Sequence, residues 1–229
     1  MKNKNTHPLY AGKNLNEILH QVPVDYYQNG IEKNLFQKLW HRTKLKCVFS
    51  MIELGNPAKA GPKKILDVGC ASGWFLSEVA KFFPLSLPTG IDLYKDAVKY
   101  GNKKYKNLKL IHCDAHALPF KNNSFDAVIC CEVLEHVGNP ERVLKEIKRV
   151  LSSNGIVVIE IDSGNFLFKI AWYWWTNIKK GVWMDAHVNT FGISKLEDLF
   201  EKNGFRIVKK RTFNFTMGIV FLLKKNKSS

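Results

Sequence analysis

Apolar and polar positions along the chain alternate between strand-like and helix-like segments. Five short apolar runs, typical of strands buried on both faces, lie near 64–69, 88–92, 108–112, 125–131 and 156–161. Segments with apolar residues at helical spacing follow them near 73–83, 94–105 and 140–152. The last helix has Asn139 as a plausible N-cap, Pro140 at its first position and Gly155 at its end. This alternation predicts a parallel sheet with helices on both faces.

The chain on either side of this core carries further regular elements. Residues 31–54 have apolar side chains at helical spacing and predict one amphipathic helix before the first strand. Ser194 and Glu197 form a capping-box pattern that opens a helix over 194–203, and Gly204 suits its end. Two further β-rich runs close the chain, at 205–212 and 215–223.

One loop carries the candidate chemistry. The first strand runs into Asp67, and Gly69 and Gly73 then bracket a turn of small residues, Cys70 and Ala71 among them. Backbone N–H groups and glycine-sized gaps let a ligand approach the main chain in such a loop. A dinucleotide fingerprint would read G-x-G-x-x-G, whereas this spacing is G-x-x-x-G after an acid, which repels a pyrophosphate and attracts an ammonium. The loop therefore favours a cationic nucleoside that bears an amino acid over NAD.

Three more motifs follow this loop in order. Asp92 ends the next strand, Asp114 and Ala115 follow the third, and the fourth strand runs into Glu132. With these motifs the chain resembles the class I S-adenosylmethionine-dependent methyltransferases, in particular the broad small-methyltransferase (type 11-like) group. The resemblance covers roughly residues 64–205 and rests on the order and spacing of the four motifs together.

The resemblance implies S-adenosylmethionine as the cofactor. Asp92 would accept hydrogen bonds from the ribose hydroxyls, and Asp114 would face the adenine amino group. Many members of the family carry glycine where this chain has Ala71, so we expect a slightly tighter loop. The residues expected to contact the cofactor are Asp67, Gly69, Cys70, Ala71, Gly73, Asp92, Leu93, Asp114, Ala115 and Glu132.

The resemblance also completes the expected fold. It is an α/β fold with a doubly wound, mostly parallel seven-stranded sheet of the Rossmann-like methyltransferase type, a C-terminal antiparallel hairpin and an N-terminal helical cap. Residues 1–62 would form the cap and residues 63–223 the cofactor-binding domain. An aromatic insertion at 163–190 would interrupt this domain, and residues 224–229 would form a basic tail.

Two histidines are candidates for catalysis on the acceptor side. In the resembling family a histidine often precedes the last helix and faces the acceptor, and His187 has this place here. His136 follows the fourth strand. An imidazole could take the acceptor's proton, although a lone histidine is more often an ordinary structural residue. Direct displacement at the sulfonium methyl group needs alignment and exclusion of water, which agrees with the lack of a catalytic triad motif.

Residues of the N-terminal segment are candidates to cover the acceptor pocket, with ordinary helix packing as the alternative. They are Asp25, Tyr26, Tyr27, Trp40 and His41.

The chain has a net charge of +15, and its positive charge is concentrated at the two ends. Residues 1–64 carry 11 basic and 4 acidic side chains, and residues 205–229 carry 7 basic and no acidic ones. Residues 65–162 carry 12 of each and are neutral. An anionic membrane surface, a nucleic acid or an anionic substrate would explain basic flanks, and so would solubility alone.

The insertion is rich in aromatic residues. Four of the six tryptophans fall between positions 172 and 183, beside Lys169 and Lys179. Its apolar run of about a dozen residues is too short to span a bilayer, which takes about 20. Trp and Tyr beside Lys are typical of an element at the headgroup level of a membrane. A packed lid over the substrate pocket and a protein interface are the alternatives.

These features indicate a methyltransferase for a small or amphiphilic acceptor, such as a lipid or lipid-linked molecule at an anionic membrane surface. A nucleic-acid methyltransferase is the alternative, but no Asn/Asp-Pro-Pro-Tyr/Phe motif follows the fourth strand and no Pro-Cys dipeptide occurs. A non-catalytic cofactor-binding protein is a third reading. The chain lacks an apolar signal region and C-x-x-C pairs, so we expect a cytoplasmic protein, with attachment to the inner face of the membrane. The acceptor atom and the oligomeric state stay open.

Overall fold

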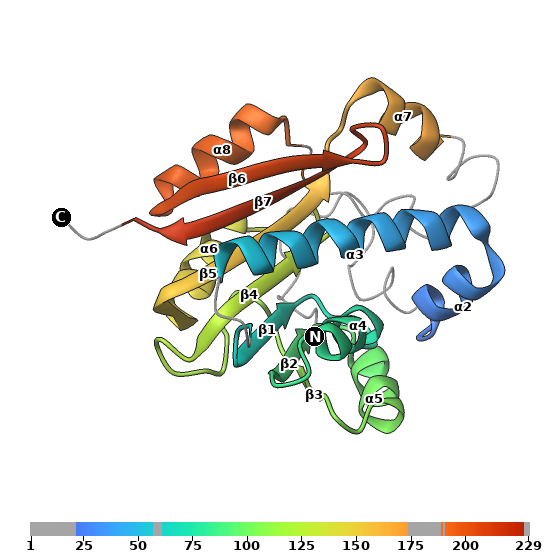
Figure 1. Ribbon diagram of the computed structural model, residues 1–229, viewed down its shortest axis with the longest axis horizontal. Coiled ribbons are helices and arrows are strands. Elements are labelled where there is room, and N and C mark those ends of the chain that lie inside the picture. The colour runs from blue at the N-terminus through green and yellow to red at the C-terminus, as the bar shows by residue number, and fades with distance from the viewer. Residues whose placement is uncertain (1–21, 57–60, 174–188, 190, 227–229) are drawn as a thin grey trace, which may run out of the picture.

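A single twisted sheet organises the molecule. The computed structural model describes residues 22–56, 61–173, 189 and 191–226. Within them, seven strands pair in the order β3-β2-β1-β4-β5-β7-β6 (Figure 1). The strands are β1 Lys64–Val68, β2 Leu87–Asp92, β3 Lys109–His112, β4 Phe125–Cys131, β5 Leu151–Asp162, β6 Phe205–Phe213 and β7 Gly218–Lys225. The first five pair in parallel and β7 pairs antiparallel with β5 and β6, which confirms the predicted fold class.

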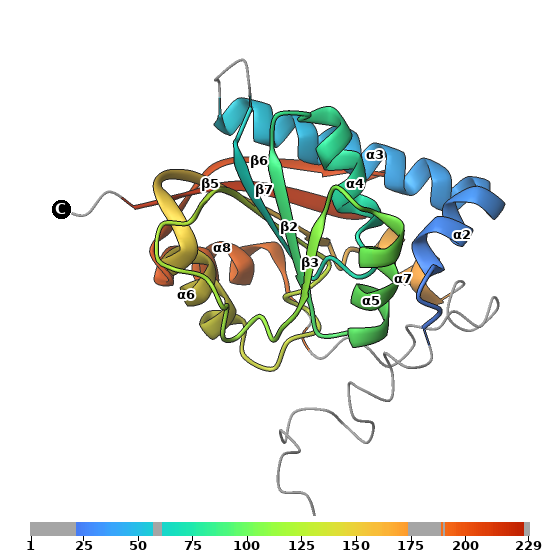
Figure 2. The same ribbon diagram turned by 90° about the horizontal axis from the view of Figure 1, so that it is seen from below.

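Helices cover both faces of this sheet. They are α2 Tyr26–Lys33, α3 Leu35–Gly55, α4 Trp74–Phe82, α5 Lys95–Lys104, α6 Pro140–Val150, α7 Phe166–Tyr173 and α8 Ile193–Lys202. Buried side chains of α3 and α4 pack against one face, and those of α6 and α8 pack against the other. Figure 2 shows these two helix layers with the sheet between them. The two apolar cores account for the near-continuous apolar runs of β4 and β5.

The strand order reverses beside β1. From β1 the chain moves outward to β2 and β3 on one side, and it then returns to place β4 and β5 on the other side. In an open parallel sheet, ligands bind beyond the carboxyl ends of the strands at such a reversal. The ends of β1, β2, β4 and β5 are therefore the expected place for a site.

The N-terminal helix differs from the prediction. Two helices, α2 and α3, replace the single helix expected over 31–54, and they meet at Asn34. Asn34 has extended backbone angles, and its side chain accepts hydrogen bonds from the N–H groups of Phe36 and Gln37, at 2.9 and 3.2 Å. This side-chain cap begins a new helix at α3, although apolar residues keep helical spacing from α2 into α3.

Two other helix boundaries were predicted wrongly. Gly155 does not end α6, because the helix stops at Val150 and β5 already begins at Leu151. Ser194 does not cap α8, since Gly192 holds the N-cap position without a side-chain bond. The N-cap at Asn139 is confirmed: its side chain accepts a hydrogen bond from the N–H of Arg142 at 3.0 Å.

The five cysteines are free thiols. Cys130 packs into one apolar core and its neighbour Cys131 packs against the other, because successive side chains of a strand point to opposite faces. Cys113 and Cys131 are only partly buried. Among the described residues, no helix is both long and apolar enough to cross a membrane.

Candidate functional site

The loop after β1 is built on its two glycines. Gly69 and Gly73 have φ angles of 81° and 82°, in the left-handed region that glycine adopts readily. The N–H groups of Gly69 and Cys70 both donate to the carbonyl of Ile91, at 2.9 and 3.0 Å. A Cβ atom at Gly69 would lie 2.2 Å from the Val133 side chain, so the loop packs directly against the segment after β4.

Asp92 ties the end of β2 to this loop. Its Oδ2 accepts a 2.7 Å hydrogen bond from the N–H of Ala71, and its Oδ1 accepts one of 2.7 Å from Tyr94. A carboxylate offers about four lone-pair positions, so two hydrogen bonds leave acceptor capacity for ribose hydroxyls. Ala71 has a φ of 47°, a strained angle for alanine, at the position where many family members carry glycine.

Asp67 lies at the end of β1 with only 3% of its surface exposed. Burial raises the pKa of this carboxyl, and the nearby charge of Asp92 raises it further, to about 7, against the lowering effect of Lys44. A positively charged ligand group beside it would favour the ionised form. This environment suits the ammonium end of S-adenosylmethionine, as the loop spacing predicts.

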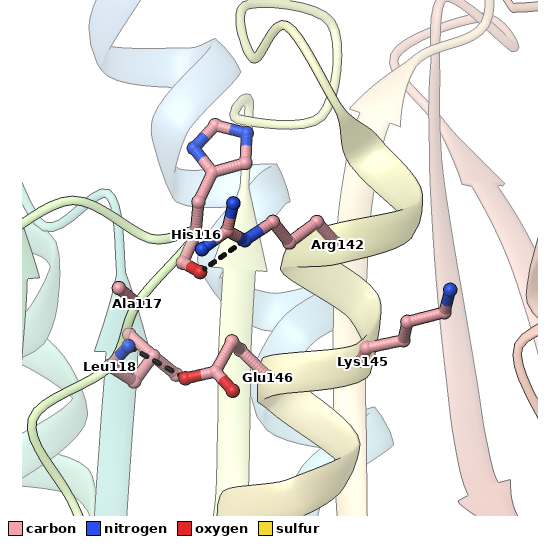
Figure 3. Close-up of a pocket in the computed structure, with 6 residues that line it drawn as sticks. All are labelled: His116, Ala117, Leu118, Arg142, Lys145 and Glu146. Atoms are coloured by element: carbon pink, nitrogen blue, oxygen red, sulfur yellow. Dashed lines mark hydrogen bonds between the residues drawn. The ribbon is translucent and has the colours of Figure 1, made fainter.

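Asp114 lies beyond β3, near a surface pocket of about 280 Å³ (Figure 3). Its Oδ1 accepts a 2.9 Å hydrogen bond from the N–H of His116 and lies 2.6 Å from Nδ1 of the same residue. These bonds with His116 lower the pKa of Asp114 despite its partial burial. They use Oδ1, which leaves Oδ2 able to face an adenine amino group.

The pocket itself lies between the loop after β3 and α6. Arg142 donates from Nε to the carbonyl of His116 at 3.0 Å, and Glu146 accepts from the N–H of Leu118 at 2.7 Å. Figure 3 shows these two bonds, with Lys145 directed away from them. The bonds hold the segment that follows Asp114 against α6, and the adenine contact of Asp114 stays a prediction.

Glu132 follows β4 and pairs with a lysine that the sequence did not single out. Lys44 of α3 places its Nζ 2.7 Å from Oε1 of Glu132, and the lysine side chain is only 5% exposed. Burial alone would raise the pKa of Glu132, but the Lys44 ammonium outweighs it and holds the pKa well below its usual range. Glu132 has a φ of 53°, so its backbone is strained at the point where it leaves the strand.

Three more acidic side chains gather around this pair: Glu135, Glu160 and Asp162. One oxygen of each of Glu132, Glu160 and Asp162 lies within 4.8 Å of the others. Burial raises the pKa of Glu135, Glu160 and Asp162, and repulsion from neighbouring carboxylates, Glu132 among them, adds to the rise. We name Lys44, Glu132, Glu160 and Asp162 the Lys44 cluster.

Aromatic side chains cover one flank of the Lys44 cluster. The His41 ring lies 5.6 Å from the Tyr27 ring and 5.7 Å from the Trp74 ring, both edge to face. Burial, with Lys44 nearby, lowers the pKa of His41 to about 3, so this imidazole is neutral at pH 7. The N-terminal helices thus bring Tyr27 and His41 over the start of α4, directly after the glycine loop.

The predicted site residues therefore fall into separate groups. Asp67, Asp92 and the glycine loop lie together at the ends of β1 and β2, with Leu93 next to Asp92. Asp114 and Ala115 follow β3, and Glu132 lies across β1 from them. His136 is half-buried and makes a minor contribution to the lowered pKa of Glu132. His187 lies outside the described residues, so its role stays a prediction.

Lys44 and Glu160 were missed, although each left a trace in the sequence. Lys44 stands on the buried face of α3, in line with His41, Val48 and Met51. Glu160 interrupts an otherwise apolar run in β5. A charge at a core-facing position requires a buried partner, and that rule would have flagged both residues.

Known proteins are similar to this chain in sequence or in fold. A family model described as a methyltransferase domain matches residues 66–159. The demethylmenaquinone methyltransferase of Staphylococcus aureus (strain JH9) is 31% identical over 186 residues, covering 72% of this chain and 77% of that protein.

Solved structures agree on the fold. A methyltransferase dependent on S-adenosylmethionine from Aquifex aeolicus has a TM-score of 0.64 at 14% identity, covering 92% of this chain and 98% of that one. One from Methanosarcina mazei has a TM-score of 0.58 at 22% identity, covering 72% and 93%.

The fold and the sequence together define an enzyme class. The chain belongs to the class I S-adenosylmethionine-dependent methyltransferases. Its cofactor is S-adenosylmethionine, as the loop spacing and the resemblance predicted.

Proposed function

We propose that this methyltransferase acts on a lipophilic acceptor at a membrane surface. The observation that carries the proposal is a row of exposed apolar side chains on α7, which follows β5 at the carboxyl edge of the sheet. Phe166, Ile170 and Tyr173 are 76, 51 and 65% exposed. Large apolar side chains that remain in water on one short helix mark an interaction surface.

The turn between β6 and β7 extends this surface. Phe215 at its tip is 85% exposed. Asn165, directly before α7, donates from Nδ2 to the Thr216 carbonyl at 2.9 Å, so the helix and the turn are held together. Figure 1 shows α7 beside this turn. The basic end segments, residues 1–64 and 205–229, carry a net charge of +7 each and would add attraction to anionic lipids. A weak apolar contact and a basic patch, acting together, support reversible attachment to a membrane.

The relative from Staphylococcus aureus supports a lipophilic acceptor. It is a demethylmenaquinone methyltransferase, and its alignment covers 72% of this chain. At 31% identity the acceptor of this chain need not be the same molecule. We propose only that the acceptor has an apolar body, which the exposed apolar side chains of α7 would contact.

The chain's residues would act mainly by position. When bound, S-adenosylmethionine supplies a methyl group already activated on a sulfonium. Asp67, Asp92, Asp114 and the glycine loop would orient it, and the aromatic cover of Tyr27 and His41 would exclude water. His187 and His136 remain the proposed residues for removal of a proton from the acceptor.

A labelling experiment tests this proposal. The purified protein is given S-adenosylmethionine labelled in its methyl group, together with a bacterial lipid extract, demethylmenaquinone under reducing conditions, or total RNA. Label in the lipid extract or the quinone fraction is the expected result. Label in RNA, with none in lipid, would favour the nucleic-acid alternative that the basic flanks also allow.

A further inference from the structure

We infer that Glu132 binds the polar, hydrogen-bond-donating group of the acceptor, with Lys44 as the positioning residue that holds this carboxylate in place. The inference rests on the proposed function, since it concerns the acceptor side of the same site. It names the class of acceptor: an apolar molecule that carries a hydroxyl or amine.

The Lys44 cluster lies where the acceptor must approach. The glycine loop and Asp92 place the cofactor at the ends of β1 and β2. Glu132 and Glu160 lie at the ends of β4 and β5, on the other side of the strand reversal. Val133, next to Glu132, packs on Gly69 of the cofactor loop. A molecule bound at Glu132 is therefore a direct neighbour of the cofactor.

Glu132 and Asp162 are the partly exposed members of the cluster, and of these two Glu132 pairs with Lys44. Its side chain is 24% exposed, while those of Lys44 and Glu160 are 5 and 0% exposed. The Lys44 ammonium contacts Oε1 of Glu132 at 2.7 Å, which leaves Oε2 for another donor. The strained backbone at Glu132 also agrees with a binding position, because strained residues occur mainly at functional sites.

Two buried carboxyl groups without hydrogen bonds provide a second observation, although Glu160 has an ion pair with Lys44 at 3.6 Å. Within the described part of the chain, neither oxygen of Glu160 has a hydrogen-bond partner, and the same holds for Glu135. These residues are 1 and 4% exposed. A buried carboxyl group without a hydrogen bond is costly, so a polar group of a bound ligand would stabilise it.

The spacing of the three carboxylates would also suit a divalent cation, but a lysine lies there. The Lys44 Nζ lies 2.7 Å from Glu132 and 3.6 Å from Glu160. An ammonium at this place supplies the positive charge that a metal would otherwise bring. Lys44 is therefore the cation of this cluster, and it comes from the N-terminal helix α3.

Naphthalene probes of matched size test the inference. Dissociation constants of 1-naphthol, 1-naphthylamine and 1-methoxynaphthalene are measured with the full-length protein saturated with S-adenosylhomocysteine. We expect naphthol, naphthylamine or both to bind at least about tenfold tighter than the methoxy compound, which donates no hydrogen bond. Naphthol alone would indicate a hydroxyl acceptor, and naphthylamine alone an amine.

Variants locate that preference. Lys44→Met and Glu132→Gln should each reduce it to below about threefold while affinity for 1-methoxynaphthalene stays unchanged. Lys44→Arg should restore most of it, which a purely structural role would not require. Lys81→Met serves as the control, because Lys81 forms an exposed 2.6 Å pair with Glu78 on α4. If Lys44→Met does not fold, as judged by S-adenosylhomocysteine binding, Glu132→Gln carries the test.

Three results would overturn the inference. One is that the wild type shows no preference among the probes, and another is that the preference persists in both variants. The third is that wild-type protein freed of metal binds Mn²⁺ and the Glu160→Gln variant does not, which would make the cluster a metal site. Methyl transfer to lipid is a separate readout: its absence alongside an intact preference would reject the proposed acceptor and leave the role of Glu132 standing.

Discussion

At the scale of single residues, Ala71 carries the clearest strain in the cofactor loop. The left-handed conformation costs alanine about 1–2 kcal/mol in the folded state. Glycine avoids this cost but loses more conformational entropy on folding, which costs about 0.5–1 kcal/mol. We therefore expect Ala71→Gly to raise the free energy of unfolding by about 0.5–1 kcal/mol in urea denaturation. Ala80→Gly, inside helix α4, should lower it by about 1 kcal/mol. Equal destabilisation by both changes would show that Ala71 is not strained.

Asp67 gives the protein a pH-dependent stability. Its pKa rises from 3.8 in the unfolded chain to about 7 in the fold, so between these values the unfolded chain binds fewer protons than the folded one. The stability linked to this group is complete below pH 3.8 and is lost as the pH rises through about 7. Asp67→Asn removes the titration, so its free energy of unfolding should increase relative to wild type across this window. A difference that stays constant with pH would contradict the assignment.

At the scale of elements, Asn34 separates α2 from α3. Its side chain satisfies two N–H groups at the start of α3. Loss of such a cap costs about 1 kcal/mol in an alanine variant and only a few tenths in a glycine variant. We expect Asn34→Ala, but not Asn34→Gly, to lower the free energy of unfolding by that amount. Wild-type stability in Asn34→Ala would mean that packing alone starts the helix.

The strands could be predicted within a few residues at most ends because their apolar runs are continuous. The end of one helix and the start of the next at Asn34 could not be predicted, since Ile31 and Leu35 continue the apolar helical spacing across it. The early start of β5 at Leu151 was missed because Gly155 resembles a helix end. Local signals at these points compete with pairing partners that only the folded sheet supplies.

The sequence predicted that the glycine loop and Asp92 lie together, whereas it did not predict the contact between Lys44 and Glu132. Asp67, Gly69, Gly73 and Asp92 lie in two short segments whose spacing is visible in the sequence. Lys44 and Glu132 are 88 positions apart, and only the packing of α3 across the sheet brings them together. No local pattern encodes such a contact.

At the scale of the whole molecule, the exposed face of α7 and the basic ends should act together. We expect anionic vesicles to sediment the protein at low salt and neutral vesicles to do so less, because the charge term falls with screening. Phe166→Ser combined with Ile170→Ser should release it. Leu85→Ser with Leu87→Ser removes equally exposed apolar side chains, 71 and 65% exposed, near the start of β2, and should not.

That comparison can fail in a defined way. If both double variants sediment like wild type, α7 does not contact lipid, and the aromatic insertion would be a packed lid over a soluble acceptor.

Calorimetric titration of S-adenosylmethionine tests the central claim most directly, namely that the cofactor binds where β1 and β2 end. Wild-type protein should bind one equivalent. Asp92→Ala should weaken binding strongly, since it removes both the predicted ribose contact and the 2.7 Å bond that holds Ala71. Asp198→Ala, an exposed carboxylate on α8, should bind like wild type. Binding of NADH without binding of S-adenosylmethionine, or full affinity in Asp92→Ala, would contradict the account.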